Sequence, residues 1–429
     1  MERFRITLES GDAQDRGRVT IGHASRIVWI SPMLSLITNR GVLPIQTLLD
    51  FKDDASIFSA DSEIPVENFQ PASLDLRLGD IAYRIQCSFL PGDDGVERRL
   101  KDFAINELDL KAEGAVLEAN RPYLIPLKEQ LALPANIRGR ANPKSSTGRL
   151  DVFTRLLTED GNRFDEIPAG YHGRLYLEVV PLSFPIRVRE DLTLNQLRLI
   201  AGNPDLSDDE IRTLHRARPI IYRAGRAVPE DELPLSNGLF LGLDVRGIGN
   251  RTRIGYKAKK NAPLLDMTTS EAIPPEPFWD TVYPDPEGRL ILDPNDFYLI
   301  MSRDFVSIPP DVASEMTAYD PTSGELRTHY AGFFDPGFGY DPAGRLRGSR
   351  AALEIRAHDV PFLVEHGQPV CKLTFEWMIQ APSTHYGHRI GSNYQQQVET
   401  LSKYFVRQPS SAEEAQFANA ETEPTIKHD

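Results

Sequence analysis

Two stretches of the chain, YLIPLKEQLALPANI at 123–137 and YLIMSRDFVSIPPDV at 298–312, align without a gap. They begin 175 positions apart (298 − 123), and Tyr-Leu-Ile, a basic–acidic pair and one proline coincide. Two shorter pairs recur in the same order at nearly the same spacing, Leu-Asp-Leu-Arg at 74–77 with Leu-Asp-Val-Arg at 243–246, and Leu-Glu-Val at 177–179 with Leu-Glu-Ile at 353–355. Because this period has the length of a domain, the chain is predicted to be a tandem duplication and not a solenoid.

Apolar and polar residues alternate at period two over short spans in each half, which is typical of β-strands. In the span 174–180, for example, Leu175, Leu177 and Val179 share one face. The 33 prolines and 30 glycines are spread between short apolar runs, as expected for many turns. One helix signal stands out, a capping box from Ser207 to Glu210 ahead of an amphipathic stretch. An all-β protein with a short helical linker is therefore predicted.

The repeats and composition divide the chain into five parts. We expect an N-terminal extension at 1–38, a first repeat at 39–200, a linker with a short helix at 201–235, a second repeat at 236–405, and a disordered tail at 406–429. The extension has no counterpart in the second half, and a start codon assigned too early, with Met33 as the true start, is an alternative.

Composition and charge exclude several classes of function. The 429 residues include 48 Lys and Arg against 62 Asp and Glu, a net charge of −14. A broad basic surface that would bind nucleic acid or an anionic membrane is therefore not expected. No apolar run is long enough to span a membrane, and no secretory signal is visible, so a cytoplasmic protein is expected. The two cysteines exclude a disulfide framework and a Cys-rich zinc site.

A small basic loop at 142–149 is the first candidate site. Lys144, Ser145, Ser146 and Arg149 could donate to phosphate oxygens and offset their charge, although a solvated turn is an equally good interpretation. The segment 322–327 repeats this loop weakly, with Ser323 and Arg327 at the same spacing of four.

Two glutamates, Glu178 and Glu354, occupy equivalent positions inside predicted strands. A mid-strand carboxylate either faces solvent or lies in a pocket, where burial raises its pKa and suits it to acid–base chemistry near neutral pH. The recurrence in both halves favours a functional role. In 74–77, by contrast, the simplest interpretation is a strand in which Asp75 and Arg77 pair with each other on one face.

Together these motifs resemble the dCTP deaminase family of the trimeric dUTPase superfamily. The resemblance rests on QPASLDLRLG at 70–79, the basic Ser-Ser loop ending in Arg149, Gly-Tyr-x-Gly-x-Leu-x-Leu-Glu at 170–178 and Pro-Ile-x-Val at 185–188. Gly-Val-Leu-Pro at 41–44 fits the family's start, and the Tyr-x-x-Gln of 394–397 fits its C-terminal tail. The similarity covers about residues 39–200 and 236–400.

This resemblance implies two tandem dUTPase-like distorted β-barrels of jelly-roll type, assembled as a homo-oligomer, with a trimer favoured. It implies hydrolytic deamination of dCTP to dUTP and ammonia, without zinc, with Mg²⁺ carried by the triphosphate. The sequence agrees independently on zinc, since it lacks both the His-x-Glu and the Cys-x-x-Cys of the zinc deaminases.

The resemblance also assigns roles to residues. Glu178 or Glu354 would be the general base, Ser145 or Ser323 would hold the attacking water, and Arg149 or Arg327 would supply positive charge. Candidates for binding the substrate are Lys144, Ser146, Ser323, Arg327, Asp335, Tyr386 and Gln397.

The two halves depart from the family pattern in complementary ways. The first keeps the Lys-Ser-Ser loop but has Pro168 where the second has the turn aspartate, Asp335, while the second has Gly324 in place of the second serine. Asn393 stands where the tail lysine is expected. We therefore hypothesise that a site forms between unlike halves, with the loop 144–149 facing Glu354 and Asp335.

Three functions stay open from the sequence. The first is a dCTP deaminase. The second is a dUTPase, or a bifunctional enzyme that converts dCTP to dUMP. The third is a non-catalytic nucleotide-binding barrel that regulates or supports other proteins.

Overall fold

A computed structural model describes residues 40–247, 253–317, 332–357, 359–387, 394–395, 397 and 399–406 in full. Outside these ranges it gives only the short paired strands β1 (Arg18–Val19) and β2 (Val28–Trp29) and the strand β25 (Leu326–Thr328). Of the predicted features, most of the N-terminal extension, Ser323, the side chain of Arg327 and the tail after Val406 lie outside the described residues.

The first half is built from short strands with three helices between them. Its elements are β3 (Gly41–Val42), α2 (Ile45–Asp53), β4 (Ile57–Ser59), β5 (Leu74–Arg77), β6 (Ile81–Ile85), α3 (Gly95–Phe103), β7 (Ala104–Asp109), β8 (Ala115–Leu117), β9 (Tyr123–Ala132), β10 (Ile137–Pro143), α4 (Ser145–Gly148), β11 (Val152–Thr158), β12 (Glu166–Ile167), β13 (His172–Pro181), β14 (Ile186–Val188) and β15 (Thr193–Ala201). One sheet runs β12-β10-β15-β3 with β5 on β15, and another runs β11-β13-β9-β6-β7 with β4 on β9.

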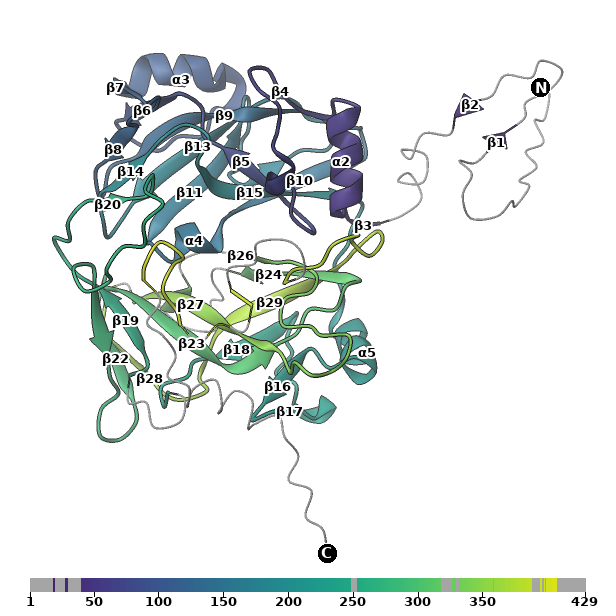
Figure 1. Cartoon of the computed structure of the whole chain (residues 1–429), viewed down its shortest axis with the longest axis vertical. Helices are drawn as coiled ribbons and strands as arrows, with labels where there is room; N and C mark the ends of the chain where they lie inside the picture. The colour runs from purple at the N-terminus through teal and green to yellow at the C-terminus, as the bar shows by residue number, and fades with distance from the viewer. Residues whose placement is uncertain are drawn as a thin grey trace, which may run out of the picture.

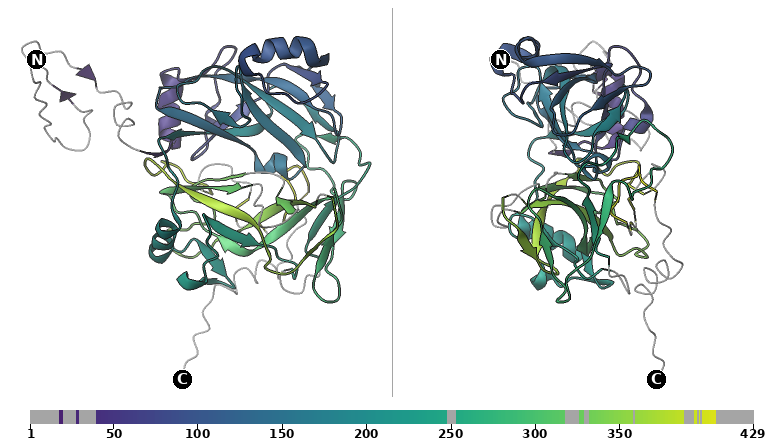
Figure 2. Two further views of the ribbon diagram at one scale, coloured as in Figure 1. Left: turned by 180° about the vertical axis from the view of Figure 1, so that it is seen from behind. Right: turned by 90° about the vertical axis from the view of Figure 1, so that its left-hand side faces the viewer.

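The second half repeats this plan. Its elements, including the joint, are α5 (Asp208–Ala217), β16 (Ile221–Arg223), β17 (Arg226–Ala227), β18 (Leu239–Gly242), β19 (Gly255–Ala258), β20 (Leu265–Asp266), β21 (Trp279–Val282), β22 (Leu290–Leu292), β23 (Phe297–Val306), β24 (Val312–Thr317), β25, β26 (Gly332–Phe334), β27 (Ser349–Ala357), β28 (Phe362–Val364) and β29 (Pro369–Trp377). Single 3₁₀ turns lie at Val66–Asn68, Gly92–Asp94 and Glu230–Glu232. The two halves stack as two β-barrels (Figures 1 and 2), which confirms the predicted fold class.

Strand register shows that the halves are copies of one domain. Glu178 on β13 lies opposite Leu124 on β9, and Glu354 on β27 lies opposite Leu299 on β23. The hydroxyl of Tyr123 accepts the backbone N–H five residues before it, and the hydroxyl of Tyr298 does the same, both at 3.0 Å. The two glutamates therefore occupy equivalent places in equivalent strand pairs.

The apolar cores of the halves are not separate. The strand β20 of the second half pairs in parallel with β14 of the first, so Leu265 packs into the first core. Phe184 of the first half contacts Phe278 and Trp279 edge-on, with ring centroids 5.4 and 5.2 Å apart. This shared packing holds the two barrels in one arrangement.

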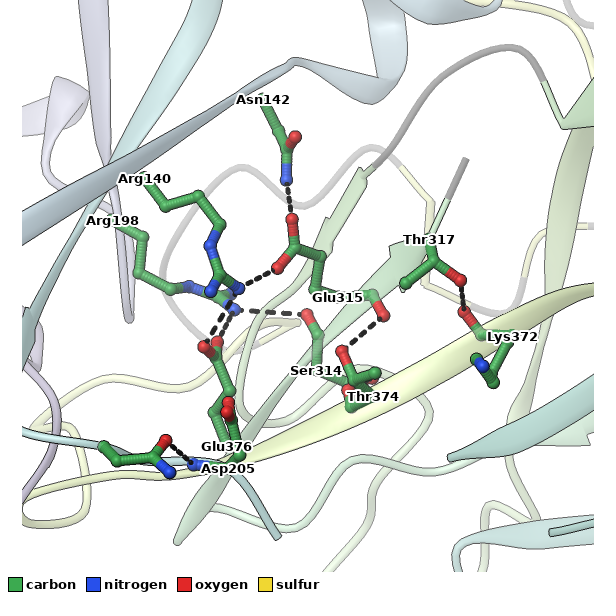
Figure 3. A network of polar contacts seen from close by, with 11 residues as sticks. Arg140, Asn142, Arg198, Asp205, Ser314, Glu315, Thr317, Lys372, Thr374 and Glu376 are labelled. Atoms are coloured by element: carbon green, nitrogen blue, oxygen red, sulfur yellow. Dashed lines mark hydrogen bonds and ion pairs between the residues drawn. The ribbon is translucent and has the colours of Figure 1, made fainter. Parts of the chain in front are cut away.

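Opposite charges meet where equivalent strands of the two halves face each other (Figure 3). Arg198 on β15 donates to Glu376 on β29 at 2.8 Å, and both side chains are fully buried. Arg140 on β10 pairs with Glu315 on β24, which also accepts a hydrogen bond from Asn142 at 2.8 Å. Buried charges are tolerated only when paired, so this network favours the pairing of unlike halves.

The linker helix α5 begins as its sequence predicts. The side chains of Ser207 and Glu210 form a reciprocal capping box at its N-terminus. No helix among the described residues is both long and apolar enough to cross a lipid bilayer.

The expected contact between Asp75 and Arg77 is wrong. The whole of β5 is buried, and each charge pairs with another element: Asp75 with Lys144, and Arg77 with Glu129 at 2.6 Å. A buried charge needs an oppositely charged partner within hydrogen-bonding distance. For Asp75 and Arg77 these partners come from other parts of the chain.

Candidate active site

The predicted basic loop forms a tight turn at the boundary between the halves. β10 leads into the single helical turn α4, which Figure 1 shows directly facing the second half. Ser145 is exposed at its start, whereas Ser146, Thr147 and Gly148 are buried. Because the exposed Ser145 hydroxyl lies beside buried backbone, this turn can present it to a ligand.

Glu354 packs directly against this turn. A Cβ atom built on Gly148 would lie 2.9 Å from Cδ of Glu354 and closer still to Oε2, so a side chain there would displace the carboxylate. β27 of the second half thus places its glutamate on the Ser145 turn of the first half. The loop and the glutamate form one site across the two halves.

The Glu354 carboxylate is poorly compensated for a buried charge. Glu354 is only 6% exposed. Among the described residues, no side chain or backbone group forms a hydrogen bond or an ion pair with its carboxylate. Burial raises the pKa of Glu354 to about 8, with the Arg149 guanidinium opposing this increase and the Asp151 carboxylate adding to it. A carboxyl group with such a pKa exchanges protons near neutral pH, as acid–base catalysis requires.

Arg149 joins the turn to the C-terminal segment of the chain. Its guanidinium donates to Oε1 of Gln397 at 2.7 Å and to the Thr400 carbonyl at 3.1 Å. It also stacks over the ring of Tyr394, 3.8 Å from the centroid. Gln397 in turn donates to the Arg350 carbonyl at 2.6 Å, so the segment is held by both halves.

Asp335 belongs to the second half and contacts residues of the first half. It contacts Arg198 at 3.4 Å and accepts the backbone N–H of Ala72. Burial raises its pKa to about 6, although Arg198 opposes the shift, and the nearby Asp75 adds to it. Asp75 pairs with Lys144, which begins the Ser145 turn and also contacts Thr193 at 2.9 Å.

Tyr386 closes the same region from the second half. Its ring packs against Phe338, and its hydroxyl accepts the backbone N–H of Tyr394 at 3.2 Å. Burial raises the pKa of the Tyr386 hydroxyl, so the phenol stays protonated and can donate a hydrogen bond.

Glu178, the equivalent glutamate of the first half, has different surroundings. It is 1% exposed, and Nε and Nη2 of Arg155 on β11 donate to its Oε1 at 3.1 and 2.5 Å. Arg155 also donates to Ser88 at 2.7 Å and stacks on the Phe164 ring. These two charge-assisted hydrogen bonds to one carboxylate oxygen compensate the charge of Glu178.

The structure thus gathers most of the predicted residues at one place. Lys144, Ser145, Ser146 and Arg149 of the first half meet Glu354, Asp335, Tyr386 and Gln397 of the second. Glu178 does not join them, and Ser323 and the Arg327 side chain lie outside the described residues.

Sequence reasoning missed two residues that contact the glutamates, Gly148 beside Glu354 and Arg155 beside Glu178. Gly148, which lies between Thr147 and Arg149 in a polar loop, gives no signal of its own in the sequence. The alternation of polar residues along 152–158 shows that Arg155 shares a face with Phe153, but only the strand register shows that Glu178 lies opposite.

Comparisons with known proteins agree with this geometry. Residues 39–203 match the family model of the 2'-deoxycytidine 5'-triphosphate deaminase N-terminal domain, and residues 207–405 match that of the C-terminal domain. A solved structure, a 2'-deoxycytidine 5'-triphosphate deaminase from Agrobacterium tumefaciens, is 43% identical, with a TM-score of 0.73 over 79% of this chain and 99% of that one.

Two curated relatives are similar over shorter stretches. A dCTP deaminase, dUMP-forming, from Methanobrevibacter smithii is 32% identical over 122 residues, 27% of this chain and 58% of that protein. A dCTP deaminase from Ignicoccus hospitalis is 30% identical over 101 residues, 23% of this chain and 52% of that protein. The chain thus matches little more than half the length of each. Both domain models and the solved structure place this chain in the 2'-deoxycytidine 5'-triphosphate deaminase family.

Proposed function

We propose that the protein hydrolyses dCTP to dUTP and ammonia, with Glu354 as the general base. The observation that carries this proposal is the contact between the uncompensated Glu354 carboxylate and the turn of Ser145 and Arg149. The family membership supports the substrate, and the raised pKa of Glu354 supports the role in proton transfer. The reaction would feed pyrimidine deoxynucleotide metabolism with a precursor of dTTP.

The residues of the site suffice for a hydrolytic deamination. Glu354 takes a proton from water as its oxygen attacks C4 of the cytosine, and the same proton is delivered to N3. Glu354 then moves the second proton of the water to the 4-amino group, which leaves as ammonia while the C4 carbonyl forms. Ser145 would hold the water and the amino group, and Arg149 would stabilise the ionised form of Glu354.

We propose that this reaction needs no zinc. The proton transfers above use a carboxylate alone, and among the described residues no group of three His, Cys, Asp or Glu side chains is placed to hold a metal ion. Mg²⁺ would enter with the substrate, bridging its phosphate oxygens.

The triphosphate would bind where basic and hydroxyl groups border the turn. Lys144, Ser146, Tyr386 and Gln397 supply such donors, and Asp335 would shape the sugar end of the pocket. Of these, Lys144 pairs with Asp75 and Gln397 with Arg149, so phosphate binding by these side chains would compete with those contacts. The proposed assembly is a homo-oligomer, with a trimer favoured by the family resemblance.

A second candidate activity is the conversion of dCTP to dUMP. It is favoured by one observation, the similarity to a dCTP deaminase named as dUMP-forming. That enzyme releases the nucleotide monophosphate, so its products differ from those of a simple deaminase.

Product analysis separates these activities. Purified protein is incubated with dCTP, CTP or dUTP in Mg²⁺ and a zinc chelator, and ammonia, pyrophosphate and nucleotides are measured. The proposal predicts ammonia and dUTP from dCTP, no pyrophosphate, and no effect of the chelator. Pyrophosphate released with ammonia would favour the dUMP-forming candidate. The absence of ammonia, or its loss on chelation, would contradict the proposal.

A further inference from the structure

An ion pair next to Glu354 ties the two halves together. Asp151 is fully buried in the turn between α4 and β11, and its carboxylate pairs with the guanidinium of Arg356. Arg356 lies two residues beyond Glu354 in β27, so both side chains leave the strand on the same face. The pair therefore joins the halves on the face of β27 that carries the glutamate.

Asp151 is held in place by contacts on several sides. Ser183 donates its hydroxyl to Oδ2 of Asp151 at 2.5 Å, and Leu182 donates its backbone N–H to the Asp151 carbonyl at 2.9 Å. The backbone of Asp151 has φ 58°, a left-handed conformation that Asp and Asn adopt more readily than most residues. On the other side of the pair, Arg356 also donates to the Asn295 carbonyl. Both partners are therefore fixed to their own halves.

The duplication alone does not account for this pair. In the first half, the position two residues beyond the glutamate is Val180, which cannot form an ion pair. An equivalent tie at Glu178 is thus impossible. The pair is present beside the glutamate that packs on the Ser145 turn.

We propose that Asp151 and Arg356 are positioning residues, which hold the Glu354 carboxylate against the turn that carries Ser145 and Arg149. The proposal rests on the proposed function, because it assigns a purpose to the placement of the general base. Neither residue needs to touch substrate. Their effect on the reaction passes through the position and the proton affinity of Glu354.

Three charged groups of the described residues surround Glu354. Arg149 and Asp151 approach from the turn after α4, and Arg356 lies on the same strand. On β23 the residue opposite is the apolar Leu299, and the side chains of β25 lie outside the described residues. Asp151 raises the pKa of Glu354. The positive charge of Arg356, paired with Asp151, acts in the opposite direction by Coulomb's law.

Two variants test the proposal because they shift the proton affinity in opposite directions. Asp151→Asn keeps the shape and the backbone conformation but removes the negative charge, so the acidic limb of the kcat–pH profile should move to lower pH. Arg356→Gln removes the positive charge that pairs with Asp151 across the halves, so the limb should move to higher pH. Both should lower kcat about tenfold with a change in KM below about threefold, since a misplaced base slows chemistry more than binding.

Ser183→Ala serves as the matched control, because it loosens Asp151 without changing any charge. It should lower kcat by about twofold to threefold and leave the limb where it is. If Asp151→Asn folds poorly, the comparison of Ser183→Ala with Arg356→Gln still tests the proposal. Wild-type kcat in both charge variants, or limbs that move in the same direction, would overturn the proposal. The proposed function would fail differently, through a wild-type protein that releases no ammonia or a fully active Glu354→Gln variant.

Discussion

Glu178 and Glu354 occupy the same place in two copies of one domain and yet have opposite surroundings. Each lies mid-strand opposite a leucine, and each is buried. Arg155 compensates Glu178 with two hydrogen bonds to one carboxylate oxygen, whereas Glu354 faces Gly148 across the boundary between the halves. Equivalent strand positions place a buried carboxylate in each half. The residues around each carboxylate determine whether it forms a structural ion pair or can exchange protons.

The largest difference between the two glutamates is expected in catalysis. Glu354→Gln removes the proposed base and should lower kcat by about 10²–10⁴-fold, the usual contribution of general acid–base catalysis. Glu178→Gln should leave kcat per folded molecule within about threefold. Rates of ammonia release, corrected for the folded fraction measured by circular dichroism, compare the two. Equal losses would show that both glutamates act in the reaction.

The arginines near the two glutamates should show the converse difference in stability. Arg155→Met leaves the buried Glu178 charge unpaired and should lower the free energy of unfolding by about 3–5 kcal/mol. The double variant Arg155→Met/Glu178→Leu should recover most of this loss. Arg149→Met, the matched change at the other site, should abolish activity with a smaller loss of stability. Urea unfolding measures these free energies, and an unaffected Arg155→Met would contradict the structural role of that pair.

The pH dependence of stability separates the glutamates next. The folded-state pKa of Glu354, about 8, exceeds the ordinary value of 4.5, so the folded protein binds this proton more tightly than the unfolded chain. Stability should therefore be greatest below pH 4.5 as far as this group is concerned. The free energy of unfolding should fall by about 1.4 kcal/mol per pH unit as the pH rises from 4.5 toward 8. Glu354→Gln should remove this part of the slope, which urea unfolding at several pH values would reveal. An unchanged slope would mean that burial does not perturb Glu354.

The smallest expected effect concerns the contact at Gly148. Gly148→Ala would push the mobile end of the Glu354 side chain away from the turn, so kcat should fall about tenfold while stability changes by less than about 1 kcal/mol. Gly332→Ala is a suitable control, because no atom of the residues that the structure describes lies within 4 Å of the Cβ it would add. If the two variants have equal kcat, the close packing at Gly148 has no catalytic meaning.

The sequence was sufficient to predict the duplication, the β-barrels and the family, because the repeat and the motifs are local patterns. It also placed both glutamates on equivalent strands. The motifs that the two halves lose in complementary ways led to the hypothesis that the loop 144–149 faces Glu354. The sequence did not show that Arg155 pairs with Glu178, since that pairing depends on the register of β11 against β13. The structure places Gly148 of that loop against Glu354. The closeness of this contact depends on how two whole barrels pack, which no local pattern encodes.

The error at Asp75 and Arg77 has a related cause. Residues two apart on a strand share a face, and this favoured a pair between them. In the folded chain the strand is buried, and Lys144 and Glu129 reach these charges from other strands and turns. Contacts between residues far apart in the sequence thus explain both the wrong pairing of Asp75 with Arg77 and the different surroundings of the two glutamates.

The central claim is that one chain builds its site across its own two halves, and mixed oligomers test this most directly. Chains carrying Arg149→Gln and chains carrying Glu354→Gln, with different tags, are coexpressed, and oligomers containing both are purified. If Arg149 and Glu354 of the same chain form the site, every site contains one of the two substitutions. The mixed oligomers should then be as inactive as oligomers of either variant alone. Recovery of a substantial fraction of wild-type ammonia release would show that the site forms between chains and would contradict the account.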